Sequence, residues 1–302
     1  AMKLALLSRN QNLYSTQRLL QAAQERHHEV QIIDTLRCYL TINNQRPWVH
    51  YHGQPLELFD AVIPRIGASI SYYGIAVVRQ FELMGIYTLS SALAISQSRD
   101  KLQSAQRLSQ CGLNTPRSSL VFHLEDIKPA IQQVGAPLVI KLLEGTQGLG
   151  VILAETQQVA ESVIEGFLAL KAQILLQEFV QEAEGKDIRC FVIGDQVVAA
   201  MQRQAPPGEF RSNLHRGGIA SAVELSDEEI NLAIQATRAL GLEVAGVDLL
   251  RTQRGAAVLE VNSSPGLEGI EAINGKNIAE QLIKFIEDRL ESRNTVESKP
   301  IQ

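Results

Sequence analysis

The most informative part of this sequence is the stretch Val258-Leu259-Glu260-Val261-Asn262-Ser263-Ser264-Pro265-Gly266, read together with Ala245-Gly246-Val247-Asp248-Leu249-Leu250. Both segments are rich in β-branched and aliphatic residues, so both are expected to form strands. The polar segment Thr252 to Gly255 between them is short enough for a hairpin. The sequence therefore predicts two neighbouring strands joined by a tight turn.

Acidic and amide side chains gather on this hairpin. Strand alternation places Glu260 and Asn262 on one face, and Asp248 on the neighbouring strand can point the same way. Ionised carboxylates are unfavourable in an apolar hairpin unless a cation or another partner neutralises them. Because oxygen ligands suit hard cations, we expect Mg²⁺ or Mn²⁺ here. The alternative is that the two acids pair with nearby arginines.

Composition narrows the class of protein. The chain has 302 residues, of which 45% are hydrophobic and 20% charged, so it should form two or three globular units. Its net charge of -5 argues against direct nucleic-acid binding, and no apolar run approaches the roughly 20 residues of a membrane span. Cys38, Cys111 and Cys190 are widely spaced and odd in number, which favours a reduced, cytoplasmic protein.

The order of predicted elements divides the chain into four parts. Residues 1–98 alternate strands with helices, which predicts a small α/β domain with a parallel sheet. Residues 99–183 and 184–290 read as two α+β blocks, the first with a glycine-containing loop and the second with the hairpin. Residues 291–302 form a polar segment that we expect to be a flexible tail. The expected fold class is therefore α/β followed by α+β.

The glycine loop Gly145-Thr146-Gln147-Gly148-Leu149-Gly150 lies between two predicted strands, residues 138–143 and 151–155. It lacks the G-x-x-x-x-G-K-[ST] pattern, and a strand rather than a helix follows it, so it is not a P-loop. A hairpin tip with bare amides can instead close over an anion. An ordinary glycine-rich hairpin is the alternative.

Several cations lie where an anion could bind. Lys141 stands within an apolar strand, and Lys101 stands at a helix start. We interpret both as phosphate ligands, although Lys141 could instead snorkel to an edge and Lys101 could be a surface lysine. The second α+β block also contains four arginines that could bind phosphate or carboxylate, or else pair with Asp248 and Glu260: Arg189, Arg203, Arg211 and Arg216.

The sequence contains no pattern typical of a protein nucleophile. There is no G-x-S-x-G, no H-E-x-x-H and no plausible Cys/His dyad, and Cys190 is expected to lie in the core. Electrostatics and metal would then carry the reaction, as in phosphoryl transfer.

The order of these features resembles the ATP-grasp superfamily over residues 99–290, and residues 2–97 resemble the domain that usually precedes it. Three strings are similar to the RimK-like glutamate ligases within it: residues 59–67 (FDAVIPRIG), 144–148 (EGTQG) and 210–218 (FRSNLHRGG). The resemblance implies an ATP-dependent, ADP-forming acid–amino-acid ligase. It would add L-glutamate to the C-terminus of a small-subunit ribosomal protein through an acyl phosphate, and could extend the chain.

The resemblance also implies roles for individual residues. The nucleotide would be held by phosphate-binding Lys101 and Lys141, loop residues Gly145, Gly148 and Gly150, adenine-binding Glu178, Phe179 and Val180, and Asp187 at the ribose. Further contacts to its phosphates would come from Arg189, Arg211, Ser212 and Asn213. The catalytic residues would be Arg203, Arg211, Asn213 and Arg216. Two ions of Mg²⁺ or Mn²⁺ would bind Asp248, Glu260 and Asn262, with Glu260 bridging.

Other functions remain open at this stage. A related ligase could act on an amino-group carrier protein or a small peptide, since arginines indicate that anions bind but not which ones. A nucleotide-binding regulatory protein without turnover is a further alternative, which the intact set Asp248, Glu260 and Asn262 disfavours. We also expect a homo-oligomer.

Overall fold

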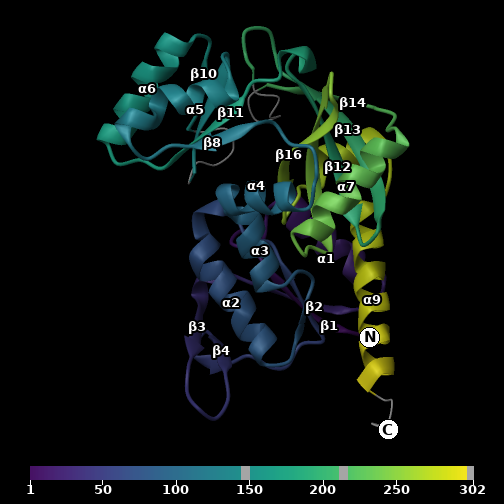
Figure 1. Cartoon of the computed structure of the whole chain (residues 1–302). Helices are drawn as coiled ribbons and strands as arrows, with labels where there is room; N and C mark the ends of the chain where they lie inside the picture. The colour runs from purple at the N-terminus through teal and green to yellow at the C-terminus, as the bar shows by residue number, and fades with distance from the viewer. Residues whose placement is uncertain (144–149, 211–216, 298–302) are drawn as a thin grey trace.

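Figure 1 shows the computed structural model of the chain, which describes residues 1–143, 150–210 and 217–297. A helical lobe that carries the small sheet of residues 118–178 lies at the top left of this view. The N-terminal segment lies below it, and the C-terminal sheet and the long last helix lie on the right. Among the described residues, no helix is both long enough and apolar enough to cross a bilayer.

The N-terminal segment forms the predicted parallel sheet, with strand order β2-β1-β6-β7. Apolar strands and amphipathic helices alternate, as the sequence indicated: β1 (Lys3–Leu7), α1 (Tyr14–Glu25), β2 (Glu29–Ile33), β6 (Ala61–Pro64), α2 (Ser71–Leu83) and β7 (Tyr87–Thr88). A small antiparallel sheet is inserted between β2 and β6: β3 (Cys38–Thr41), β4 (Trp48–Tyr51) and β5 (Gln54–Pro55). The 3-10 turns η1 (Thr35–Arg37) and η2 (Ala68–Ile70) complete this segment.

Two short helices lead into the next segment. Helix α3 (Ala92–Arg99) ends at Asp100, and the Asp100 carboxylate accepts a hydrogen bond from the Gln103 amide to cap α4 (Lys101–Gln110). A side-chain acceptor at this position satisfies an amide that the helix itself leaves unpaired. The double role of Asp100 places Arg99 and Lys101 on either side of one sharp break.

The middle lobe, residues 118–178, is an antiparallel sheet of order β10-β9-β11-β8 covered by two helices. Its elements are β8 (Ser118–Leu120), η3 (Leu124–Asp126), α5 (Ile127–Val134), β9 (Leu138–Leu142), β10 (Val151–Ala154), α6 (Gln157–Ala169) and β11 (Ile174–Glu178). Side chains from the sheet and both helices form a core of its own, which includes Ile131, Ile140, Ile164 and Leu176. The lobe is thus packed separately from the rest of the chain.

The C-terminal sheet has the order β14-β13-β12-β15-β16. After η4 (Gln181–Ala183), its elements are β12 (Lys186–Ile193), β13 (Gln196–Gln204), β14 (Ile219–Ser221), α7 (Asp227–Ala239), β15 (Val244–Thr252) and β16 (Gly255–Asn262). Ser226 and Glu229 form a capping box at the start of α7. The predicted hairpin is confirmed as the antiparallel pair β15–β16.

One hydrophobic core joins the N-terminal sheet to the C-terminal sheet. Leu4 and Leu6 of β1 belong to the same buried cluster as Phe191 of β12 and Ile283 of α9 (Ile278–Glu297). Helix α8 (Glu268–Asn274) contributes to it as well. The parts of the chain that precede and follow the middle lobe in the sequence therefore pack as one body.

The last helix is longer than the sequence analysis expected. We predicted a flexible tail from residue 291, but α9 continues as a helix to Glu297. Polar side chains do not end a helix when its preceding turns are anchored to the rest of the protein. That anchor includes the ion pair of Glu287 with Arg26, 2.7 Å, and the hydrogen bond of Glu287 with His28, 2.6 Å. Residues 298–302 lie outside the described part.

Candidate active site

A β-bulge sets which face of the hairpin carries the acids. Asp248 pairs with Glu260 and Gly246 with Asn262, but the register shifts between Asp248 and Leu249. Because Leu249 pairs with Val258, residue Leu259 is the extra one on β16. Val258 and Val261 can therefore both face the core under α7, while Glu260 and Asn262 face away from it. The predicted shared face of Asp248, Glu260 and Asn262 agrees with this register.

Arginine side chains surround Asp248 on the same sheet. The Arg189 Nε and Nη2 atoms donate to its two carboxylate oxygens at 2.5 and 3.2 Å, and Arg203 Nη2 lies 3.1 Å from Oδ2. Burial opposes ionisation of Asp248, yet Arg189 and Arg203 hold its pKa below the ordinary value. The alternative in which Asp248 pairs with arginines is therefore what the structure contains.

Arg203 links two acids. Its Nε and Nη2 atoms donate to the Asp187 carboxylate at 2.8 and 2.6 Å, while Nη2 also reaches Asp248. Burial by itself would lower the pKa of Arg203, but the carboxylates of Asp248 and Asp187 raise it overall. Arg203 thus bridges the carboxylates of Asp187 and Asp248. The side chain of Asp187, which was expected at the ribose, faces Arg203.

The donor set on this face fits a hard cation. Among the described residues, no three His, Cys, Asp or Glu side chains gather in a way that could hold a metal, so a site needs the Asn262 amide as its third ligand. Asp248 Oδ1 accepts a hydrogen bond from Arg189 Nε, and a carboxylate oxygen can accept more than one. Glu260 is exposed and makes no ion pair with a described residue. Oxygen donors of this kind suit Mg²⁺ or Mn²⁺.

Lysines from two other elements face the acids. Burial lowers the pKa of Lys141 on β9, and the negative charges of Glu260 and Asp248 offset part of this effect. The pKa of Lys101 is also lowered by burial, against the influence of Glu260, and its Nζ lies 3.4 Å from the Leu142 carbonyl oxygen. The structure therefore brings Lys101 and Lys141 within range of the Glu260 charge.

Only one end of the glycine loop can be compared with its prediction. Gly150 has φ +71°, and a Cβ there would lie 2.8 Å from Leu142 Cδ1, so this position requires glycine. Gly145 and Gly148 lie outside the described residues. So do four further residues expected at the site: Arg211, Ser212, Asn213 and Arg216.

The predicted adenine segment connects the middle lobe to the C-terminal sheet. The Glu178 carboxylate pairs with Arg117, 3.1 Å, and with Arg254, 2.5 Å, so its side chain ties the lobe to the β15–β16 turn. Phe179 packs edge-on against Phe210 at 6.2 Å between ring centroids. Val180 is buried and leads into η4.

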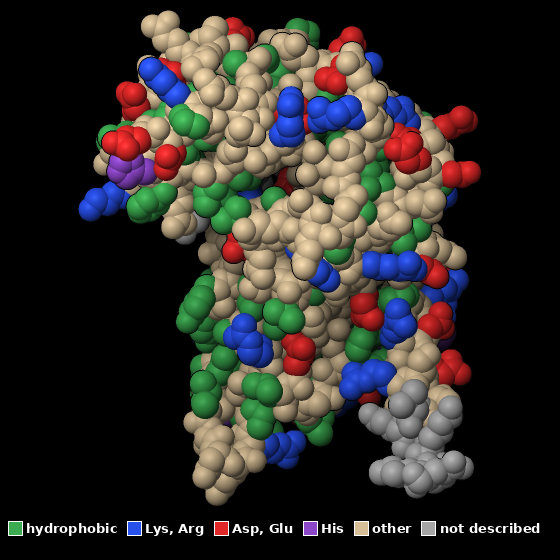
Figure 2. All heavy atoms as spheres, viewed as in Figure 1, with side chains coloured by type: hydrophobic (Ala, Val, Ile, Leu, Met, Phe, Trp, Pro, Cys, Tyr) green, Lys and Arg blue, Asp and Glu red, His purple; other side chains and the backbone are tan. Residues whose placement is uncertain are grey.

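A cavity of about 190 Å³ lies beside this connection. Its lining residues include Glu182, Lys186, Asp187 and Arg251, from η4 and the neighbouring strands. Figure 2 shows the face of the molecule hollowed between the middle lobe and the rest of the protein, with acidic and basic side chains at the edges of the hollow. Asp187, which was predicted at the ribose, therefore borders this cavity.

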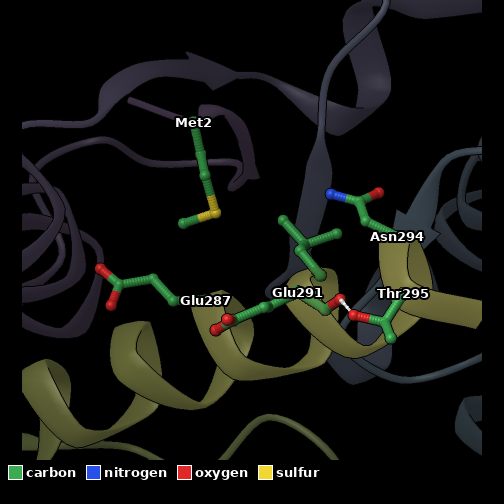
Figure 3. A pocket seen from close by; sticks show the side chains of 6 residues that line it. Met2, Glu287, Glu291, Asn294 and Thr295 are labelled. Carbon is green, nitrogen blue, oxygen red and sulfur yellow. Dashed lines mark hydrogen bonds between the residues drawn. The ribbon is translucent and has the colours of Figure 1, made fainter. Parts of the chain in front are cut away.

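Another pocket, of about 470 Å³, is unrelated to these residues. Figure 3 shows it between Met2 and one side of α9, lined also by Glu287, Glu291, Asn294 and Thr295. None of the residues expected at the active site lines it.

No cysteine among the described residues is placed for nucleophilic chemistry near the acids. Burial raises the pKa of the Cys190 thiol to about 12, and Cys190 is fully buried under α7. The expectation that Cys190 is a core residue is confirmed.

Comparison with known families decides the relationship. The RimK-like ATP-grasp domain matches residues 98–286, and the RimK pre-ATP-grasp domain matches residues 2–95. The chain belongs to the RimK-like ATP-grasp family. It is an ATP-dependent ligase of the ADP-forming type, and both expectations about its fold, an ATP-grasp core and a preceding α/β domain, are confirmed.

Relatives of this RimK-like chain match it over nearly its whole length. The probable alpha-L-glutamate ligase 1 of Hahella chejuensis is 60% identical over 97% of each chain. A probable alpha-L-glutamate ligase of Methanococcoides burtonii is 59% identical over 95% of each chain. Among solved structures, the ATP-grasp ligase PsnB complexed with a phosphomimetic variant of minimal precursor, Mg and ADP has a TM-score of 0.72 at 23% identity, covering 95% of this chain and 98% of its own.

Two arginines at the site of this RimK-like chain were not selected from the sequence. Arg65 follows β6 and Arg99 ends α3, and the Glu260 charge acts on Arg99. Arg65 belongs to the string 59–67, and it stands at the carboxyl end of a buried parallel strand, where ligands of α/β sheets commonly bind. That position was the signal that could have identified it.

Proposed function

We propose that this protein is an α-L-glutamate ligase that adds L-glutamate to the C-terminal glutamate of a small-subunit ribosomal protein. The observation that carries the proposal is the 60% identity to a probable alpha-L-glutamate ligase over 97% of the chain. The cluster of Lys101, Lys141, Glu260 and Asp248 supports it, because such a cluster suits the charges of ATP and a divalent cation.

The proposed reaction has two steps. An acceptor carboxylate oxygen attacks the γ-phosphorus of ATP, the bond to the β–γ bridging oxygen breaks, and ADP leaves with its electron pair. The glutamate amine then attacks the carbonyl carbon of the acyl phosphate, an amide bond forms, and inorganic phosphate leaves as the amine loses a proton. Neither step needs a protein nucleophile, in keeping with the absence of one near the described acids.

Residues of the chain then bind and orient the reactants. Lys101 and Lys141 contact the phosphates of ATP, which removes negative charge from the path of the attacking carboxylate. Asp248, Glu260 and Asn262 hold two ions of Mg²⁺ or Mn²⁺, which supply Lewis-acid stabilisation of the phosphoryl oxygens when bound. Arg203 positions Asp187 and Asp248. Arg189 is adjacent to the phosphates, and it fixes the orientation of Asp248.

The remaining proposed contacts come from the glycine loop, from residues 211–216 and from the adenine segment. In this proposal Gly145 and Gly148 would close over the phosphates together with Gly150. The nucleotide and the reacting groups would be contacted by Arg211, Ser212, Asn213 and Arg216. The backbone of Glu178, Phe179 and Val180 receives the adenine, with the ribose near Asp187. A closed site protects the acyl phosphate from water.

Intact-mass analysis tests the acceptor directly. Purified small-subunit ribosomal proteins are incubated with this protein, ATP, Mg²⁺ and L-glutamate, and mass increments of one glutamyl residue are expected on one of them. An amino-group carrier protein and a short peptide ending in glutamate are incubated in parallel. Addition to either of these, with none to a ribosomal protein, would move the assignment to that acceptor. Phosphate release without any addition would contradict glutamate transfer itself.

A further inference from the structure

The carboxyl edge of the N-terminal parallel sheet carries arginines that form no salt bridge with a carboxylate in the described part of the chain. Strand β1 is flanked by β2 on one side and β6 on the other, so the chain changes direction across the sheet between β1 and β6. Crevices at such a switch point, outside the carboxyl ends of the strands, are where open α/β sheets bind ligands. Arg9 follows β1, and Arg65 follows β6.

Backbone pairing brings these two positions together. Leu7 pairs with Pro64, and the Arg65 amide donates to the Leu7 carbonyl oxygen at 3.0 Å. The Arg65 guanidinium donates through Nη1 to the carbonyl oxygen of Pro265 at 2.8 Å. It is thereby held against the segment that directly follows the strand of Glu260 and Asn262. The edge of the sheet and the proposed metal site are neighbours.

A second guanidinium adds to the same region. Arg99 Nη2 donates to the Ile66 carbonyl oxygen, next to Arg65 in sequence. The Arg99 Nε atom is buried and finds no hydrogen-bond partner in the described part of the chain, and the same holds for the Ser263 hydroxyl. Buried donors without partners are rare in folded proteins, and they commonly indicate a ligand or ordered water.

The charges of this cluster are unbalanced. Burial, and then the charge of Arg99, lower the pKa of Arg65 to about 10. Burial also lowers the pKa of Arg99, with Glu260 acting in the opposite direction. Within residues 1–143, 150–210 and 217–297, no carboxylate makes a salt bridge with Arg9, Arg65 or Arg99. Two desolvated guanidinium groups that repel each other are stabilised when an anion binds between them.

We propose that Arg65 and Arg99 bind a substrate carboxylate, with Arg9 at the exposed rim of the same site. This proposal rests on the proposed function, and it assigns the carboxylate to the incoming glutamate or to the terminal glutamate of the acceptor. Guanidinium forks bind carboxylates through paired N–H groups. Because Arg99 also faces Glu260, the bound carboxylate lies beside the phosphate and metal residues. There the amine of the incoming glutamate, or the acyl group of the acceptor, can react.

Kinetics of substitution variants test this assignment. In Arg65→Gln and Arg99→Gln, we expect the KM of one carboxylate substrate to rise about 10- to 100-fold, as for loss of a charged hydrogen bond. The affinity for an ATP analogue should stay within about twofold, since neither residue contacts the nucleotide in this scheme. The substrate whose KM rises identifies the source of the carboxylate. Arg65→Lys should fall between wild type and Arg65→Gln, because lysine keeps the charge without the fork.

Arg79→Gln is the matched control. Arg79 is an exposed arginine on α2 of the same domain, and its replacement should leave every constant unchanged. Unchanged KM values for both carboxylate substrates in folded Arg65→Gln and Arg99→Gln would overturn the proposal. If these two variants do not fold, Arg9→Gln at the rim is measured instead, and an unchanged KM there would overturn it as well.

Melting temperatures provide a readout that does not depend on turnover. Without ligand, Arg99→Gln should melt no lower than wild type, because a like-charge repulsion is removed. L-Glutamate or an acceptor peptide ending in glutamate should raise the melting temperature of wild type and Arg79→Gln but not of Arg65→Gln. Stabilisation by inorganic phosphate alone would assign the site to phosphate and overturn the proposal. This measurement decides the site even if no acceptor is ever glutamylated.

Discussion

Asp248 and Glu260 stand directly opposite each other across the hairpin of β15 and β16. Cross-strand neighbours of like charge destabilise a sheet unless something neutralises them. Asp248 is neutralised by Arg189 and Arg203, whereas Glu260 is exposed and faces Lys101 and Lys141. The two acids are therefore unequal: Asp248 is held in place by two arginines, and Glu260 forms no ion pair with a described residue.

Glu260→Gln should abolish glutamate transfer while the fold stays intact. The amide keeps the shape of the side chain but loses the charge that would bridge two cations. We expect activity near background, an unchanged or raised melting temperature without metal, and a smaller stabilisation by ATP with Mg²⁺. The control is Glu165→Gln, which changes an exposed side chain on α6. Near-normal turnover of Glu260→Gln would show that these acids are structural.

Lys141→Met should weaken ATP binding without lowering the stability of the ligand-free protein. We expect a loss of about 2 to 4 kcal/mol in calorimetry, the range for removing a charge-assisted contact from a buried site. Burial lowers the pKa of Lys141, so an apolar side chain of similar length should keep or raise the free energy of unfolding. Lys128→Met, on exposed α5 of the same lobe, should change neither quantity. An unaltered ATP affinity would mean that Lys141 is not a phosphate ligand.

Arg203→Met should destabilise the protein strongly at neutral pH. It removes the partner that joins the buried carboxylates of Asp187 and Asp248, and breaking a buried ion pair typically loses about 3 to 5 kcal/mol. In wild type these pairs stabilise the fold above the ordinary pKa of Asp248, 3.8, and the stabilisation falls away below it. Urea unfolding at pH 7 and pH 5 should show a smaller deficit at pH 5, because loss of the Arg203 charge raises the pKa of the buried Asp248 carboxylate in the variant. Arg238→Met, an exposed change on α7, is the comparison, and an equal effect of both variants would refute the idea.

Glu287 should make the contact between α9 and the N-terminal segment less stable as the pH falls into the acid range. A hydrogen bond from Arg26 has the largest effect on the pKa of Glu287. Burial opposes this effect and a hydrogen bond from His28 adds to it, and together they lower the pKa from 4.5 to about 2. A carboxyl whose pKa is depressed by folding stabilises the fold above its unfolded pKa, and this contribution is lost as pH falls toward the folded pKa. Glu287→Gln should thus lower the melting temperature at pH 7 and lose its effect between about pH 4.5 and pH 2. Glu291→Gln on the same helix serves as the control. A pH-independent deficit would contradict the ion-pair explanation.

Local patterns predicted most of the elements because strand and helix periods survive packing. The strands of the parallel sheet and the hairpin of β15 and β16 follow directly from aliphatic runs bounded by polar turns. The shared face of Asp248 and Glu260 was also predictable, although the bulge at Leu259 was not, because one extra residue leaves no signature in composition.

Long-range pairings were less accessible. The sequence offered pairing with Asp248 as one alternative for Arg189, but the link from Arg203 to both Asp187 and Asp248 depends on β12 lying between β13 and β15. Arg99 carried no distinguishing signal in the sequence, because its place at the site depends on α3 ending against Ile66. The continuation of α9 likewise depends on Arg26, which is far away in sequence.

The buried cluster shared by β1, β12 and α9 has a consequence for how the chain comes apart on heating. The family match changes from one domain to the next between residues 95 and 98, yet that boundary cuts through a continuous interior. A fragment ending there would expose a hydrophobic surface to water and aggregate. The lobe of residues 118–178, with its self-contained interior, is the piece that can melt by itself. Evolutionary modules and cooperative folding units are thus divided at different places along this polypeptide.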